Sequence, residues 1–463
     1  SCWSSGKTFE DAKLKQREDM NRELPSSSQL EDLEMIKVNY NNLGHDEKRC
    51  FSSLLQFPEN TVMKRREIIL WCSAVLWSGR PSGIGNRSLW FLFVHERVDH
   101  WFDSLLKSKV IVPYGNGKSP IASKFKINPL VRHKSLRPLL QNEEEQFCDY
   151  YSQIMTSSHQ SDIGYKCLAL DQHKIKISDE SGFTSNRWNV VLNVGASYLN
   201  FGPGWMNKMK HLEVLQLGRW LQGSPKLQGS PKHHIEVASE EFLRELRGQK
   251  NLRHLSLRGI SRIFELPPFI FQLENLEILD LKACHNLETL PSDISPLRYL
   301  IHLDLSQCYL LDRMPKGIES LIRLRFLKGF VLGSSSKSPC RISDLANLKN
   351  LNRLSIHIVS GAVIQGGEFQ RLKELSKLEH LKISWGVFDT RYTDIQISFP
   401  SSLKKLHLEG FPGQNIPEWL KPSKLPSKSK ESELSKSPEA LTELHITGGK
   451  LTNLDHGENN INW

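Results

Sequence analysis

The chain has 463 residues, of which 38% are hydrophobic and 24% charged, and it carries a formal net charge of +10 at pH 7. These proportions are ordinary for a globular protein and exclude wholesale disorder or a collagen-like chain. The longest near-apolar run, residues 68–77, is much shorter than the ~20 residues a membrane helix requires, so no membrane span is expected. The chain begins with neither a Met nor the apolar core of a signal peptide, and we expect an N-terminally truncated fragment.

The 8 cysteines are scattered and form no C-x-x-C pair. In a chain of this length they are typical of reduced thiols, which predicts a cytoplasmic protein. The positive charge permits acidic partners. No basic stripe accompanies a recognisable nucleic-acid-binding motif, so we expect no nucleic-acid partner.

The N-terminal third combines a polar segment with helical patterns. Residues 1–30 are polar and predict a linker. Apolar residues recur at helical spacing within residues 31–60, 64–77 and 90–110, and residues 110–127 read as a β-hairpin. Three helical stretches followed by a hairpin predict a small, mainly helical winged-helix domain over residues 31–135. Residues 136–187 are expected to be a connector and an N-terminal cap.

A repeat organises the rest of the chain, which we assign as one domain over residues 188–463. The pattern L-x-x-L-x-L recurs nine times, and Leu252, Leu276, Leu300 and the degenerate copy at Leu324 begin 24 residues apart. Periods of 20–29 residues are typical of leucine-rich repeats. The second leucines of the nine copies are Leu215, Leu255, Leu279, Leu303, Leu327, Leu354, Leu381, Leu406 and Leu444.

Stacking is what makes such units stable. The leucines of one short strand point to one face, and a single unit cannot bury them. Nine stacked units therefore predict an α/β fold, a curved leucine-rich-repeat solenoid with a parallel sheet on its concave side. Such a sheet is a binding surface without catalytic chemistry of its own.

Three details of the repeats carry expectations. The hexapeptide L-Q-G-S-P-K occurs twice in succession, at residues 221–232, and residues 421–440 are rich in Ser, Lys and Pro. Both segments predict surface loops, and deleting residues 227–232 is expected to change stability little. Cys284 and Cys308 follow a repeat leucine by three residues and are interpreted as small buried residues.

The solvent-facing positions of each strand are expected two, four and six residues after the first leucine. Acids fall there only at Asp280, Asp304, Glu409 and Glu443, and a further histidine at His445. The hypothesis is an acidic partner that docks more tightly below pH 6.5 as the histidines become charged. The candidate partner-binding residues are His254, Arg258, Lys282, His302, Lys328, Arg353, His357, His380, Lys382, Lys405 and His407.

Particular motifs resemble plant intracellular immune receptors of the coiled-coil, nucleotide-binding, leucine-rich-repeat class. The N-terminal ones are Asn39-Tyr40-Asn41-Asn42-Leu43, Lys48-Arg49-Cys50-Phe51, Phe57-Pro58-Glu59 and Ile68-Ile69-Leu70-Trp71. In the repeats, Met314-Pro315-Lys316-Gly317 and Leu327-Lys328-Gly329-Phe330 resemble the HopZ-activated-resistance type. That resemblance implies indirect sensing of pathogen effectors through a receptor-like cytoplasmic pseudokinase adaptor, and oligomerisation with other receptors.

Complete members of that family bind ADP or ATP in a module that should precede residue 31. The family's M-H-D motif, whose His contacts the nucleotide, corresponds here to Ile127-Asn128-Pro129. Asn128 is therefore the candidate nucleotide contact, although Pro129 removes a carboxylate. We expect no cofactor in this chain.

Motifs for other chemistry are incomplete. Gly6-Lys7-Thr8 and Gly117-Lys118-Ser119 lack the first glycine of a phosphate loop. His95 and His100 are five residues apart, so they lie on different faces of a helix and predict no metal site. We expect a non-enzymatic immune-receptor fragment. The alternatives are a truncated scaffold or decoy that binds the partner without signalling, and a receptor that retains nucleotide binding.

Overall fold

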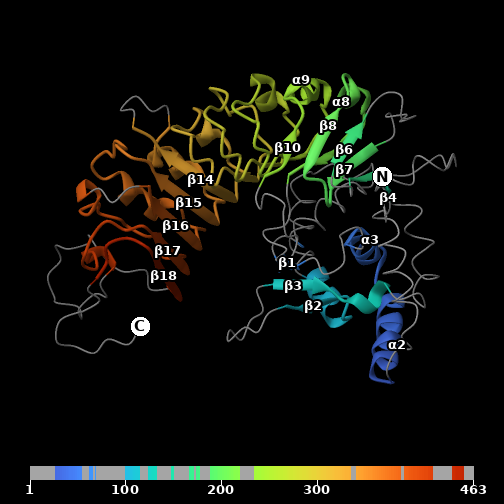
Figure 1. Ribbon diagram of the computed structural model, residues 1–463. Coiled ribbons are helices and arrows are strands. Elements are labelled where there is room, and N and C mark those ends of the chain that lie inside the picture. Colours follow the sequence, from blue (N-terminus) through green and yellow to red (C-terminus); the bar gives the residue numbers. More distant parts are fainter. Residues whose placement is uncertain are drawn as a thin grey trace, which may run out of the picture. The chain divides into compact units, whose positions relative to one another are not determined.

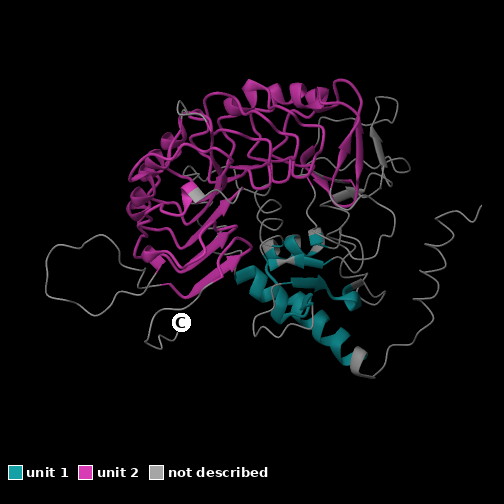
Figure 2. Ribbon diagram, turned by 60° about the vertical axis from the view of Figure 1, so that its left-hand side comes forward, with its two compact units in different colours: residues 1–146 teal, residues 147–463 magenta. Residues whose placement is uncertain are grey.

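In the computed structural model the chain divides into two compact units, residues 1–146 and 147–463 (Figure 2). The second unit begins well before residue 188, where the sequence places the start of the repeat domain. The structure describes residues 27–54, 62–65, 68, 100–114, 124–132, 148–150, 166–170, 174–177, 188–218, 234–334, 340–386, 390–420 and 441–452.

The first unit combines helices with a three-stranded antiparallel sheet. Its helices are α2 (Ser27–Asn41), α3 (His45–Leu54) and residues 100–107, and η1 (Pro129–Arg132) is a 3-10 turn. Strands β1 (Val62–Lys64), β2 (Ile111–Pro113) and β3 (Lys124–Ile127) pair in the order β1-β3-β2. The pairing of Ile111 with Ile127 confirms the predicted hairpin.

The core of this unit follows the helical spacing of the sequence. Leu33, Ile36 and Tyr40 are buried on one face of α2, and the rings of Phe102 and Phe125 meet edge to face at 4.9 Å. Of the helix predicted over residues 64–77, Lys64 instead pairs with Lys124 in the sheet, whereas Arg65 and Ile68 are helical as predicted. Most of the remaining predicted helix lies outside the described residues.

The second unit is built on one long parallel sheet whose strands follow one another in chain order (Figure 1). The described part of this sheet has 12 strands. They are β4 (Cys148–Tyr150), β5 (Lys166–Leu170), β7 (Trp188–Asn193), β9 (Val214–Gln216), β11 (His254–Ser256), β12 (Ile278–Asp280), β13 (His302–Asp304), β14 (Phe326–Leu332), β15 (Arg353–Ile358), β16 (His380–Trp385), β17 (Lys405–Glu409) and β18 (Glu443–Thr447).

The outer side of the arc carries a smaller sheet and short helical turns. Strands β6 (Lys174–Ile177), β8 (Tyr198–Phe201) and β10 (Glu236–Val237) form a parallel sheet in the order β10-β8-β6. The turns line the outer edge in Figure 2. They are α8 (Trp205–Lys208), α9 (Glu241–Glu245), η5 (Leu246–Gly248), η6 (Pro268–Gln272), η7 (Ile318–Ser320), η8 (Ile342–Asn347), η9 (Glu368–Glu374), η10 (Thr390–Tyr392) and η11 (Glu418–Leu420).

The nine predicted repeat strands are confirmed as β9 and β11 to β18. The second leucine of each motif is the direct register partner of the next, from Leu215 to Leu444. This register holds because an unbroken column of leucines is the only arrangement that keeps every core side chain away from water. Strands β7, β5 and β4 extend the same sheet beyond the first leucine motif, and β5 and β4 lie in the predicted connector.

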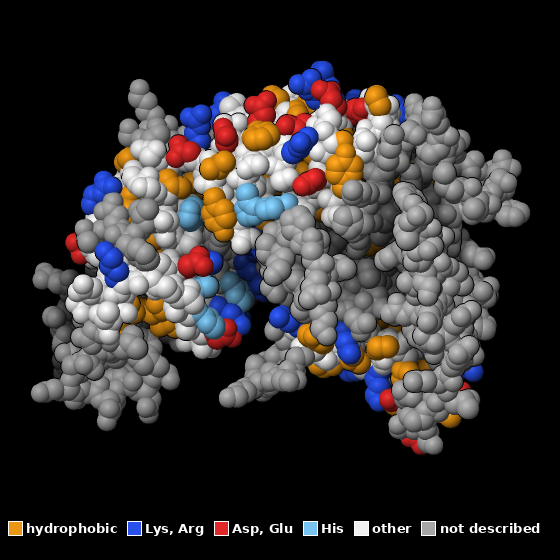
Figure 3. All heavy atoms as spheres, viewed as in Figure 1, with side chains coloured by type: hydrophobic (Ala, Val, Ile, Leu, Met, Phe, Trp, Pro, Cys, Tyr) orange, Lys and Arg blue, Asp and Glu red, His pale blue; other side chains and the backbone are white. Residues whose placement is uncertain are grey.

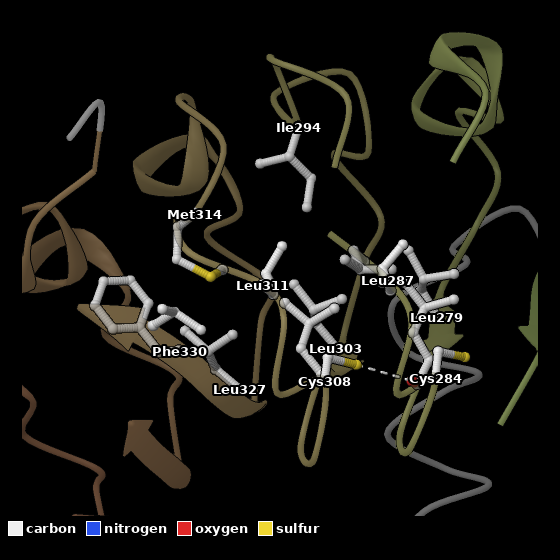
Figure 4. Close-up of a cluster of buried hydrophobic side chains, with 14 of the residues drawn as sticks. Leu279, Cys284, Leu287, Ile294, Leu303, Cys308, Leu311, Met314, Leu327 and Phe330 are labelled. Carbon is white, nitrogen blue, oxygen red and sulfur yellow. Dashed lines mark hydrogen bonds between the residues drawn. The ribbon is translucent and has the colours of Figure 1, made fainter. Parts of the chain in front are cut away.

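The core between neighbouring repeats is filled by the strand leucines and by residues of the turns, among them two cysteines. Leu279, Leu303 and Leu327 lie side by side in Figure 4 and are at most 1% exposed. The thiol of Cys284 donates to the carbonyl of Leu257 at 3.2 Å, and the thiol of Cys308 donates to that of Leu281 at the same distance. The interpretation of both cysteines as buried residues is therefore confirmed, and each links its unit to the preceding one.

In the degenerate copy of the motif, which begins at Leu324, a β-bulge brings another side chain into the third core position. The third core position of that unit would fall on Gly329, which has φ +74°, and the register shifts between Lys328 and Phe330. Phe330 is fully buried and pairs with Ile356, so it takes the place of the missing leucine. A side chain at position 329 would put its Cβ 2.5 Å from the Leu305 carbonyl carbon, so glycine is required there.

Candidate functional site: the concave face

Side chains on the concave face form columns, because successive strands present the same position about 4.8 Å apart. The first column is Val214, His254, Ile278, His302, Phe326, Arg353, His380, Lys405 and Glu443. The second is Gln216, Ser256, Asp280, Asp304, Lys328, Ser355, Lys382, His407 and His445. Arg258, Lys282, His357 and Glu409 lie two residues further along their strands or just beyond them.

The N-terminal part of this face is closed, which contradicts the predicted exposure. His254, His302 and Arg258 are 2%, 6% and 7% exposed, and Asp304 is 2% exposed. Neighbouring columns cover one another here. His254 Nε2 lies 3.1 Å from Gln216 Oε1, the His302 ring packs on Phe326, and Arg258 pairs with Asp280. These residues hold the units together and are poorly placed to meet a partner.

The C-terminal part is open. Lys382 and Glu409 approach to 2.9 Å with 37% and 49% of their side chains exposed. Lys405 and Glu443 approach to 2.5 Å with 42% and 44% exposed. The predicted residues Lys282, Lys328, Arg353, His357, His380 and His407 are half-buried, and the Arg353 guanidinium lies over the Phe326 ring at 5.9 Å. Figure 3 shows basic, acidic and histidine side chains next to one another over the C-terminal strands.

Each of the four acids on this face contacts a predicted cation of a neighbouring repeat. The pairs are Arg258–Asp280 at 3.9 Å, Lys328–Asp304 at 3.7 Å, Lys382–Glu409 and Lys405–Glu443. These charged residues were predicted from the sequence, but their pairing was not. The signal was present, since Lys405 and Glu443 occupy the same position of consecutive motifs.

The two kinds of pair differ in strength. Exposed ion pairs stabilise a fold by about 0–1 kcal/mol because water and salt screen them. Breaking a buried pair by removing one partner costs about 3–5 kcal/mol, because a charge is left without compensation. The pairs on β16–β18 are therefore the ones that can exchange partners at low cost.

Burial opposes the protonation of four histidines on this face. Burial lowers the pKa of His254 to about 4. Burial, followed by the positive charges of Arg353 and Lys405, lowers the pKa of His380 to about 4. Burial also lowers the pKa values of His357 and His407. For His254 and His380 the predicted strengthening of an acidic contact just below pH 6.5 is wrong, because a pKa of about 4 leaves both side chains neutral there.

Asn128, the candidate nucleotide contact, is 8% exposed within the first unit. Its Nδ2 donates to the Lys109 carbonyl at 2.9 Å, and its Oδ1 accepts from the Leu130 amide at 3.1 Å. The side chain thus joins the turn after the third helix to the start of η1. This is a structural role, and contact with a nucleotide stays a prediction.

Other sequence features are only partly described. The phosphate-loop-like tripeptides, His95, the duplicated hexapeptide and residues 421–440 lie outside the described residues. Within the described ranges, no three His, Cys, Asp or Glu side chains come together as metal ligands. None of the helices in those ranges has the length and apolar character needed to cross a membrane.

Comparison with known proteins supports the repeat assignment. Residues 206–430 match the family model described as a leucine-rich repeat region. Over 152 residues the chain is 32% identical to "Disease resistance RPP13-like protein 4" of Arabidopsis thaliana, a match that covers 31% of this chain and 16% of that protein.

Two solved structures are also similar, at low scores. A Leptospira interrogans LRR protein has a TM-score of 0.37 and 21% identity, covering 62% of this chain and 67% of its own. A TDR receptor has a TM-score of 0.34 and 14% identity, covering 65% and 50%. At these scores the assignment of fold rests on the register of the strands.

Proposed function

We propose that this chain is the recognition portion of a plant disease-resistance receptor, and that it works by binding a partner protein and not by catalysis. The proposal rests on the 32% identity over 152 residues with a disease-resistance protein, together with the leucine-rich-repeat region at residues 206–430. A long parallel sheet with an open, charged face suits the binding of another protein surface.

Finer features of the proposal rest on the resemblance of individual motifs. The partner is a receptor-like cytoplasmic pseudokinase adaptor, the first unit is a winged-helix domain, and the protein acts in the cytoplasm. In a complete receptor, docking of the adaptor would release a nucleotide-binding module and allow oligomerisation. The antiparallel hairpin and the three helical segments of the first unit support the winged-helix assignment.

Co-expression in leaves tests the receptor role. The chain is expressed with candidate pseudokinase adaptors, and complex formation is measured by co-purification. The proposal is supported if an adaptor binds the unaltered chain and does not bind a variant with a disrupted repeat core. Failure to bind any adaptor of that class refutes the named partner.

A scaffold or decoy that binds the adaptor without signalling is the second candidate. A decoy binds the adaptor and lowers the cell-death response of an intact receptor, whereas a signalling fragment raises it. Measuring cell death with and without this chain separates the two. Nucleotide content of the purified protein tests the remaining alternative, because ADP bound at one molecule per chain would contradict the expectation of no cofactor.

A further inference from the structure

We propose that the open part of the concave face binds a carboxylate-rich segment of a partner protein by exchanging its own carboxylates for those of the partner. This surface, the C-terminal concave patch, consists of Arg353, His380, Lys382, Lys405 and His407 together with Glu409 and Glu443. The proposal rests on the proposed function only in taking the repeats as a protein-binding surface.

Geometry selects this part of the sheet. The ion pairs on β11–β14 involve side chains that are 13% exposed or less, so a partner has no access to them. The pairs Lys382–Glu409 and Lys405–Glu443 have every side chain at least 37% exposed. A partner can reach these lysines and their present carboxylates without opening the core.

The cations of the C-terminal concave patch favour a partner that carries carboxylates. Lys382 and Lys405 lie on adjacent strands, and Arg353 lies beside them on β15 in the same column as Lys405. Burial is the main cause of the low pKa of His380. Arg353 and Lys405 lower that pKa further, and each has a larger effect than the opposing Glu379 and Glu443, which indicates a positive potential at this place. Glu409 and Glu443 come from the C-terminal side and already show where carboxylates fit against the two lysines.

The internal acids consequently compete with the partner. A glutamate or aspartate of the partner that bonds Lys382 must displace Glu409, and one that bonds Lys405 must displace Glu443. Removing the internal acids is therefore expected to strengthen binding. A surface that merely needed intact ion pairs would instead lose affinity, so the sign of the effect distinguishes the two arrangements.

The experiment measures the fluorescence anisotropy of a labelled decaglutamate peptide with the full chain. Glu409→Gln and Glu443→Gln should each tighten binding, by up to about fivefold, which is the upper worth of an exposed ion pair. Lys382→Gln combined with Lys405→Gln should weaken binding by about tenfold or more. Binding to the unaltered chain should fall as salt is raised.

Matched variants on the outer side control for net charge. Glu374→Gln removes an acid that pairs with Arg371 at 3.0 Å on η9, and Lys316→Gln removes a lysine that pairs with Asp293 at 3.7 Å. Both should leave peptide binding unchanged. Circular dichroism should show that every variant is folded, because each altered side chain is at least 28% exposed.

Two outcomes would overturn the proposal. One is an increase in peptide affinity for Glu409→Gln and Glu443→Gln that is no larger than the increase for Glu374→Gln. The effect would then come from net charge alone. The other is equally tight binding of an oligothymidylate of the same charge, which would make the surface a general polyanion site. The two proposals can fail separately. If the peptide binds as expected but no adaptor complex forms in leaves, this inference stands and the proposed function fails.

Discussion

Truncation of Leu279 tests the column of leucines on which the fold rests. Leu279 is fully buried and is flanked in register by Leu255 and Leu303. Leu279→Ala removes three carbon groups, worth about 2.4 kcal/mol at roughly 0.8 kcal/mol each. The neighbouring strands are fixed and cannot collapse into the space, so a cavity term brings the loss to about 3–5 kcal/mol.

Leu444 provides a matched control within the same column. It occupies the same position of the motif on β18, but it is only half-buried, whereas its neighbour Leu406 on β17 is fully buried. Leu444→Ala removes the same atoms, but only about half of their surface is buried and no enclosed cavity is left. The free energy of unfolding is therefore expected to fall by about 1 kcal/mol.

Urea unfolding followed by far-UV circular dichroism measures both variants. Equal m-values would show that the same structure unfolds in each, so that the midpoints can be compared as free energies. A loss below about 1 kcal/mol for Leu279→Ala would refute the proposed register. Equal losses for the two variants would refute the argument that burial from both sides sets the magnitude.

The remaining predictions concern the bulge, the buried histidine and the thiols. Gly329→Val should lower the free energy of unfolding by about 2 kcal/mol or more, because its φ is +74° and a Cβ would meet the preceding unit; Gly366→Val, at an open position with ordinary φ, should cost about 1 kcal/mol or less by the same urea assay. The folded-state pKa of His254 is about 4, below the ordinary histidine value of 6.5, so the unfolded chain binds the proton first. Its contribution to stability is complete above pH 6.5 and is lost as the pH falls toward 4, by about 3 kcal/mol. A pH series of unfolding curves should show that loss reduced in His254→Gln, and an unchanged pH profile would contradict it. Burial raises the thiol pKa values of Cys284 and Cys308. Iodoacetamide followed by peptide mass spectrometry should label them only after unfolding, and rapid labelling of the native protein would show that the units open.

The repeat, the order of its strands and its leucine core are all predictable from the amino-acid sequence. The leucine motif recurs once per unit, so adjacent units can bury their leucines only when the motifs lie in register, as Leu255 and Leu279 do. The hairpin at Ile111 and Ile127 was equally predictable, since its pairing is local in sequence.

Tertiary structure alone decided which concave side chains meet solvent. His254 and Lys405 occupy the same position of their motifs, yet the first is 2% exposed and the second has 42% of its side chain exposed. That difference depends on the neighbours contributed by other strands, and so do the low pKa of His254 and the pairing of Lys382 with Glu409. A one-dimensional repeat specifies which residues share a column. Desolvation and ion pairing are set by the distances between side chains of neighbouring strands, and those distances exist only once the repeats have stacked.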